Sequence, residues 1–408
     1  MRLSQYPSFH LTYCSNIHPG EQWEEVLGQL KTHIPELKQR LSPDQPFGIG
    51  LRLSARAAEE LKNRGRLDEF KGWLDSGNCY VFTMNGFPYG NFHRRRVKDL
   101  VYLPDWRTEQ RVEYTLNLAD ILAELVPEGM DGGISTSPIS YKYWLQQKSL
   151  KEQAFREGSK NFARVAHALA IIRREQDKLL HIDIEPEPDC LLENSREMIH
   201  FFSNWLLPVG SAFLMVEYGL GSDEAEATLK EHIRLCYDTC HFAVEYEDPA
   251  EALQKITKAG IKLGKVQVSA ALKVALPEAP SDRRQIKAQL QQFDESTYLH
   301  QVVERREDGT FFQYRDLDNA LPHIYDGQAR EWRIHYHVPL FVDAFEQLNS
   351  TRSDIGQSLE YVKEHDLCRH FEIETYTWEV LPEELKRDSV DSIEREFKWV
   401  LEEFDKAL

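Results

Sequence analysis

The chain has 408 residues and a formal net charge of −18, from 49 Lys and Arg against 67 Asp and Glu. A surface of this sign repels nucleic acid, so we expect no nucleic-acid partner. The N-terminus lacks the basic and apolar segments of a signal peptide, and the most apolar stretch carries Pro208 and Glu217. The six cysteines form no CxxC pair. These features predict a cytoplasmic protein that is not inserted in a membrane.

Short apolar runs alternate with amphipathic stretches along the whole chain. The runs predict strands at residues 9–14, 47–53, 78–84, 132–137, 179–185, 234–239, 264–270 and 370–375. Apolar residues at three- and four-residue intervals predict helices at residues 21–40, 55–76, 109–125, 150–176, 195–207, 222–232 and 249–259. Eight strands that alternate with helices favour a (β/α)8 TIM barrel over two separate sheets, with residues 1–408 forming a single domain.

Two long insertions interrupt this pattern. One follows the third predicted strand at about residues 85–107, and the other follows the seventh at about residues 272–341. The second insertion contains VVERREDGTFFQYRDL, which predicts a hairpin that turns at Asp308 and Gly309. Because ordered loops of this length usually serve a site, both insertions indicate function near the third and seventh strands.

Polar side chains recur where the last four predicted strands end. Glu185 follows the fifth strand, Asp238 ends the sixth, Gln267 lies at the same level in the seventh, and Glu374 ends the eighth. In a TIM barrel these ends share one mouth, so the four side chains should form a ring. Three carboxylates this close repel one another, so they either take up protons or bind a divalent cation, and a cation is the simpler solution.

The segment LCYDTCHFAVEYED (235–248) has other interpretations. Cys240 would be a nucleophile only with a base held against it, and its sequence neighbour His241 is the only candidate. Alternatively, Asp238 caps the helix that follows the strand, and His241 is hydrogen-bonded nearby. The agreement of four strand ends favours the metal interpretation.

The first insertion carries the densest basic run of an acidic chain. Glycines and Pro88 predict tight turns, and the candidate substrate-binding residues are Asn85, Tyr89, His93, Arg94 and Lys98. A phosphate or carboxylate on a substrate would suit this loop as a lid over the mouth. The alternative is that HRRRVK is a solvated face that pairs with surface acids.

LHIDIEPEP, LCYDTCHFAVEYED, KVQVS and FEIETYTW resemble strand ends of the xylose-isomerase-like TIM barrels, which include sugar isomerases, epimerases and endonucleases of the endonuclease-IV type. The resemblance implies that Glu185, Asp238, Gln267 and Glu374 bind a metal, and that His241 is a second-metal or substrate residue. The superfamily usually has histidine at the seventh strand. Glutamine there suits Mg²⁺ or Mn²⁺ better than Zn²⁺, so the metal identity stays open.

RIHYHVPLF (333–341) places His335 and His337 on one face of an extended segment. They partly resemble the Asp-x-His pair of the endonuclease-IV type, but the aspartate is absent, and the third and fourth strands end without that family's histidines. A trinuclear zinc site is therefore not expected. The pair has three interpretations: a second metal position, substrate contacts, or packed histidines satisfied by backbone carbonyls.

NGFPYGNFH and GGISTSPISYKYW resemble the bacterial EboE-type metabolite traffic proteins, a branch of the same superfamily. The resemblance implies a role in moving a small secondary metabolite, with a membrane-bound transport or biosynthetic partner. Two functions follow: a metal-dependent isomerase or epimerase in which Glu185 and Glu374 exchange a proton at carbon, or a non-catalytic metabolite carrier that supports export. An endonuclease-IV-like nuclease is a distant third.

Overall fold

Eight parallel strands form a barrel in this computed structural model, which describes residues 1–408 except 7, 91–96, 295–296, 376, 378–387 and 407–408. The strands are β1 (His10–Tyr13), β2 (Phe47–Arg52), β3 (Cys79–Asn85), β4 (Gly132–Thr136), β5 (Leu180–Ile184), β6 (Ile233–Asp238), β7 (Leu263–Val268) and β14 (His370–Ile373). Their order is β1-β14-β7-β6-β5-β4-β3-β2, and a parallel bridge between Cys14 and Gly50 links the two end strands. The predicted (β/α)8 fold is confirmed.

Helices follow the barrel strands and bury the stripes that the sequence predicts. In α1, the buried residues include Trp23, Leu27, Leu30, Ile34 and Leu37, at helical spacing. The helices around the barrel are α1 (Trp23–Leu41), α2 (Ala55–Leu61), α3 (Arg64–Ser76), α4 (Glu109–Leu125), α5 (Lys148–Gln176), α6 (Ser195–Phe201), α7 (Ser211–Tyr218), α8 (Ser222–His232), α9 (Thr239–Val244), α10 (Pro249–Lys258), α13 (Arg352–Glu364) and α14 (Ser389–Asp405).

Two predicted helices differ in detail. The stretch 55–76 is two helices, because the Asn63 side chain accepts from Gly65 N and caps α3 two residues after α2 ends. The stretch 195–207 continues through a π-helix, Phe202–Gly210, into α7. By length and composition alone, Ser195–Tyr218 could cross a membrane, and 28% of its most apolar window is buried.

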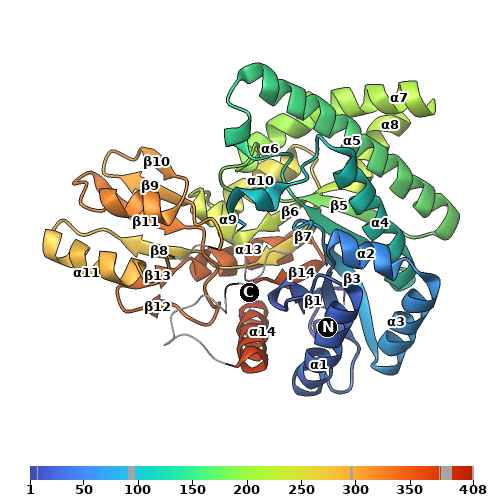
Figure 1. Ribbon diagram of the computed structural model, residues 1–408, viewed down its shortest axis with the longest axis horizontal. Coiled ribbons are helices and arrows are strands. Elements are labelled where there is room, and N and C mark those ends of the chain that lie inside the picture. Colours follow the sequence, from blue (N-terminus) through green and yellow to red (C-terminus); the bar gives the residue numbers. More distant parts are fainter. Residues whose placement is uncertain (7, 91–96, 295–296, 376, 378–387, 407–408) are drawn as a thin grey trace.

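The second insertion forms its own antiparallel sheet beside the barrel, drawn from yellow (β8) to orange-red (β13) in Figure 1. Its strands are β8 (Leu272–Ala275), β9 (Val302–Arg306), β10 (Phe311–Tyr314), β11 (Ala329–Ile334), β12 (Ala344–Phe345) and β13 (Leu348–Ser350), in the order β10-β9-β11-β8-β13-β12. Its helices are α11 (Pro280–Leu290) and α12 (Leu317–Ala320). The predicted hairpin is confirmed: β9 pairs with β10 around Gly309, whose φ is +81°. The sheet continues to Ser350, beyond the predicted limit of 341.

Charged residues fill the barrel interior just below the mouth. Lys265 donates to Glu372 Oε2 (2.5 Å) and to Ser135 Oγ (3.0 Å), and both charged side chains are completely buried. A Cβ atom on Gly50 would lie 1.9 Å from Glu372 Oε1, so this position in β2 makes room for the carboxylate. The Lys265–Glu372 pair connects β7 and β14 directly below the strand ends at the mouth.

Candidate metal centre

Three of the predicted ring carboxylates converge at the barrel mouth. Glu185 directly follows β5, Asp238 ends β6 and Glu374 directly follows β14. One oxygen from each lies within 4.8 Å of the others, and all three residues are buried. The parallel register makes this possible, because Glu185 N donates to Thr136 O (3.0 Å) and Glu374 N to Val268 O (3.0 Å), which continues each ladder by one residue.

Asp238 divides its two oxygens between two environments. Oδ1 accepts from Cys240 N (2.8 Å), His241 N (3.1 Å) and Ser269 Oγ (2.6 Å), and so caps α9. Oδ2 is buried and has no hydrogen-bond partner among the described residues. The capping interpretation is therefore correct for Oδ1, whereas Oδ2 is left without a partner beside the other two carboxylates.

Glu185 and Glu374 differ in how they are held. Glu374 Oε1 accepts from Asn85 Nδ2 (3.1 Å) and from Asn16 Nδ2, whereas Glu185 Oε2 is buried without a partner among the described residues. Burial, followed by the nearby carboxylates, raises the pKa of both residues. At neutral pH such a site binds either protons or a cation.

Gln267 completes the ring without a hydrogen bond of its own. It lies opposite Asp238 and Glu372 in the ladders and is completely buried, and neither Oε1 nor Nε2 has a partner among the described residues. A buried amide in this condition costs about 1–3 kcal/mol. A ligand in the mouth would remove that cost.

His241 and His335 face each other through nitrogens that both carry lone pairs. His241 Nδ1 lies 2.8 Å from Pro186 O and His335 Nδ1 lies 2.8 Å from Gln301 Oε1, and these oxygens can only accept. The Gln301 amide is oriented by its own donation to Pro188 O (3.1 Å). The two Nε2 atoms, which lie 3.1 Å apart, are therefore both unprotonated in the neutral rings.

Neutral rings are also what their surroundings favour. Burial lowers the pKa of both His241 and His335, and the neighbouring histidines lower the pKa of His335 further. Two lone pairs in contact repel, so the arrangement fits a shared cation. Glu187 supplies an oxygen beside this pair, and Tyr102 donates to its Oε1 (2.9 Å).

His337 links the histidines to the ring. The Nδ1 atom of His337 lies 2.8 Å from Glu374 O. Its imidazole also lies close enough to Asp238 and His241 for the three residues to share one metal ion. Both His335 and His337 follow β11, so the second insertion brings them into the mouth. The structure thus brings together all seven predicted residues of the ring and the histidine group; their roles as ligands or substrate contacts stay predictions.

A cavity of about 80 Å³ opens above these residues, and the first insertion lines part of it. Asn85 and Lys98 line it as predicted, although Lys98 also pairs with Asp316. Tyr89 is not among the lining residues, because its ring packs against Tyr114 (5.2 Å) beside a separate surface hollow. The predicted contacts His93 and Arg94 lie outside the described residues.

Several residues of the site were not predicted. Glu187 is the second glutamate of EPEP, and its period-two spacing from Glu185 could have identified it. Asn16 lies three residues after the end of β1, where polar residues of a barrel mouth are expected. Ser269 and Gln301 have no sequence signal, because their contacts with Asp238 and His335 depend on the tertiary structure.

No family model matches the chain, and no curated protein matches it. Solved structures similar to it include a D-tagatose 3-epimerase-like protein, at 10% identity and a TM-score of 0.49 over 97% of each chain. The IOLI protein with a bound zinc atom is 13% identical, with a TM-score of 0.48 over 98% of this chain and 99% of that one. A xylose isomerase-like TIM barrel protein from Mycobacterium smegmatis in complex with magnesium is 11% identical, with a TM-score of 0.48 over 97% of this chain and 96% of that one. The fold assignment rests on the strand order of this chain itself.

Proposed function

We propose that the chain is a divalent-metal-dependent isomerase or epimerase of the xylose-isomerase-like kind, acting on a small polyhydroxylated or anionic metabolite. The observation that carries the proposal is the convergence of three buried carboxylates on a mouth where oxygens of Glu185 and Asp238 have no hydrogen-bond partner among the described residues. Buried groups of this kind are costly unless a ligand or a function uses them.

The donor set fits a metal ion. Glu185, Asp238, Glu374 and Gln267 offer only oxygens apart from the amide nitrogen, which suits Mg²⁺ or Mn²⁺. His241 and His335 with Glu187 offer nitrogen and oxygen, which suits a second ion such as Zn²⁺. When bound, such a cation polarises a carbonyl and stabilises the negative charge that develops beside it.

The side chains of the mouth would carry the proton. Asn85 and Asn16 hold Glu374 Oε1, so Oε2 is the oxygen that takes up or releases a proton at the substrate carbon. Without metal, burial and the neighbouring carboxylates raise the pKa of Glu185, and raise the pKa of Glu374 to about 8, which favours the uptake of a proton that an acid-base exchange at carbon requires. Tyr102 donates to Glu187, and Phe87 and Val101 line the cavity with apolar surface.

The substrate class and the setting are further parts of the proposal. The resemblance to EboE-type proteins favours a small secondary metabolite, handled in the cytoplasm together with a membrane-bound partner. The small cavity and the neutral Gln267 are also compatible with a carrier that binds a metabolite without turnover.

Solvent-deuterium exchange tests the proposal. The chain, loaded with Mn²⁺, is incubated in D2O with a panel of ketoses, aldoses and their phosphates, and incorporation of deuterium at carbon is followed by NMR. We expect incorporation into at least one sugar, lost in Glu374→Gln and retained in Glu402→Gln on the exposed face of α14. A protein that binds a sugar and a metal but exchanges no carbon-bound hydrogen supports the carrier instead.

A further inference from the structure

A second group of metal-ligating side chains lies at the opposite end of the barrel. Asp131 directly precedes β4, His181 is the second residue of β5 and His370 begins β14. Their ligand atoms lie within 4.8 Å of one another. Asp131 Oδ2 lies 3.5 Å from His181 Nε2, and Asp131 Oδ1 lies 3.2 Å from His370 Nε2. Donor atoms on one tetrahedral zinc ion lie roughly 3.3 Å apart, given metal-ligand bonds near 2.0 Å.

The interior of the barrel orients His181 toward this group. Its Nδ1 lies 2.6 Å from Asp183 Oδ1, so the ring donates there and presents Nε2 as an acceptor. Histidines that bind zinc are commonly oriented by a carboxylate in this way. A Cβ atom on Gly264 would lie 1.8 Å from Asp183 Oδ1, and one on Gly133 would lie 2.6 Å from His181 Cε1. Two glycines therefore make room for the Asp183–His181 pair.

The two histidines have ring nitrogens without hydrogen bonds. His370 has an exposed fraction of 1%, and neither of its nitrogens has a hydrogen-bond partner among the described residues; the same holds for His181 Nε2. The Asp131 carboxylate lies at ion-pair distance from both rings, 3.2 Å from His370 Nε2 and 3.5 Å from His181 Nε2, and a shared cation would bind all three groups at once.

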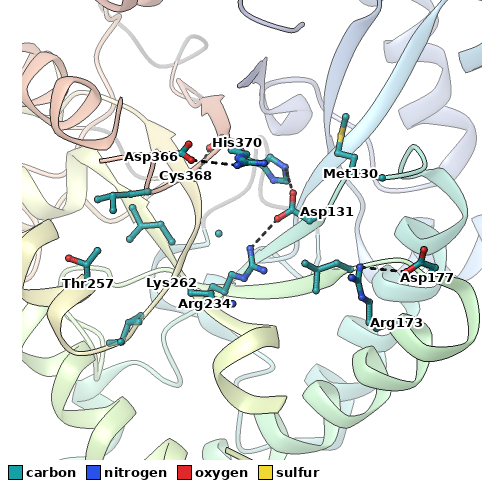
Figure 2. A pocket seen from close by; sticks show the side chains of 18 residues that line it. Met130, Asp131, Arg173, Asp177, Arg234, Thr257, Lys262, Asp366, Cys368 and His370 are labelled. Carbon is teal, nitrogen blue, oxygen red and sulfur yellow. Dashed lines mark hydrogen bonds and ion pairs between the residues drawn. The ribbon is translucent and has the colours of Figure 1, made fainter. Parts of the chain in front are cut away.

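A cavity of about 700 Å³ gives access to the group from the solvent, and Figure 2 shows Asp131 between His370 and Arg234 at its wall. Arg234 donates to Asp131 Oδ2 (3.1 Å) and also pairs with Glu231 (3.3 Å). Its charge is therefore shared with another acid, and Oδ1 stays directed at His370. The cavity leaves space for water or a small ligand as a fourth donor.

We propose that Asp131, His181 and His370 bind a zinc ion at the N-terminal face of the barrel, separate from the centre at the mouth. Two nitrogens and one carboxylate oxygen are a donor set that Zn²⁺ favours. Because β14 and β5 are separated by β7 and β6 in the sheet, the ion would connect strands that share no ladder. It would thereby stabilise the N-terminal face, or floor, of the barrel.

The test measures zinc on a chain whose mouth centre is disabled. The full chain carrying Glu374→Gln, His241→Gln and His335→Gln, which breaks every candidate ligand group found at the mouth among the described residues, is stripped with a chelator, dialysed against Zn²⁺ and analysed for bound metal. We expect about one zinc ion per chain. Adding Asp131→Asn or His370→Phe should remove it and should abolish the visible absorption of four-coordinate Co²⁺ in the cobalt-substituted protein. His10→Phe is the matched control, because this buried histidine of the floor bonds to Tyr80 and is not a ligand.

The outcomes decide the proposal in either direction. It is overturned if the disabled chain binds no zinc. It is also overturned if Asp131→Asn and His370→Phe retain the zinc of the parent. Should His370→Phe fail to fold, Asp131→Asn decides alone, since the asparagine side chain has the same size as this partly buried aspartate and keeps its packing. Failure of the mouth centre leaves these measurements unaffected, because they are made in its absence.

Discussion

Asp238 shows at the scale of one residue how two interpretations of a sequence can both be correct. The sequence could place this carboxylate at a strand end, where a cap and a metal ligand look alike. It could not predict that Ser269 and two backbone amides donate to Oδ1 while Oδ2 has no hydrogen bond among the residues that the structure describes. The tertiary contact from Ser269 decides which oxygen is available, and no local pattern encodes it.

Substitution of Asp238 separates the two roles. Asp238→Asn keeps an oxygen for the cap and removes the charge, so the metal-free protein should be as stable as the parent or more stable, while stabilisation by Mn²⁺ disappears. Asp238→Ala also removes the cap and should cost about 0.5–2 kcal/mol with or without metal. Thermal unfolding with and without Mn²⁺ measures both. A destabilised Asp238→Asn that keeps the full response to Mn²⁺ would contradict the assignment.

Glu396 gives a pH dependence that is independent of metal. Its Oε1 accepts from Thr375 Oγ1 (2.7 Å) and Leu340 N (3.2 Å), and burial raises its pKa from 4.5 to about 8. The folded state therefore holds this proton more tightly than the unfolded state. Its contribution to stability is complete below pH 4.5 and is lost as the pH rises to about 8.

Chemical denaturation across this pH range tests the effect. Glu396→Gln cannot titrate, so its free energy of unfolding should fall less between pH 4.5 and 8 than that of the parent. Glu402→Gln, an exposed neighbour on α14, should match the parent. Parallel curves for Glu396→Gln and the parent would show that Glu396 is ionised throughout.

Secondary-structure elements could be predicted from the sequence where their buried residues form a long apolar run or a regular amphipathic pattern. All eight barrel strands were found because parallel strands buried on both faces are continuous apolar runs. The strands β12 and β13 were missed because two or three residues carry no period, and the insertion was therefore ended too early at residue 341. The helices α13 and α14 were not among the predicted helices, although both bury amphipathic stripes.

The positions of β9 and β11 give a prediction about the second ion proposed at the mouth, at the His241–His335 pair. Gln301 directly precedes β9 and holds His335, which directly follows β11, so the register of these strands fixes the tautomer of His335. Gln301→Met removes this acceptor and should weaken Zn²⁺ binding at the His241–His335 pair by about 10–100-fold. Competition with a chromophoric chelator measures the affinity. Gln347→Met, exposed on the turn between β12 and β13, should bind like the parent; equal loss in both variants would contradict the role of Gln301.

At the scale of the whole molecule, one continuous hydrophobic core runs through the barrel and the second sheet. We expect the chain to behave as a single domain for that reason, and because the second sheet supplies two histidines to the mouth. The sequence predicted where the insertion begins. It could not predict that the segment after β11 enters the mouth, because that depends on contacts such as His335 N to Gln301 O (2.8 Å) and Val338 N to Ala270 O (3.0 Å).

Calorimetry tests the single domain. The completely buried Trp332 lies in β11 and donates to Glu304 Oε2 (2.9 Å), so Trp332→Ala should cost about 3–5 kcal/mol. If barrel and sheet unfold together, one transition moves to lower temperature as a whole. Phe312→Ala, at an exposed position of β10, should leave it in place. Two transitions, of which only one moves, would show that the second sheet unfolds independently.

Gly50, Gly133 and Gly264 should not tolerate substitution, although the reason is steric and not catalytic. None of the three has a positive φ, and none lines the cavity at the mouth, yet any side chain there would collide with Glu372, His181 or Asp183. In a survey of all single substitutions they should be as intolerant as active-site residues. Their intolerance would reflect the buried charged side chains along the barrel axis, because these side chains occupy the space that a side chain at each glycine position would need.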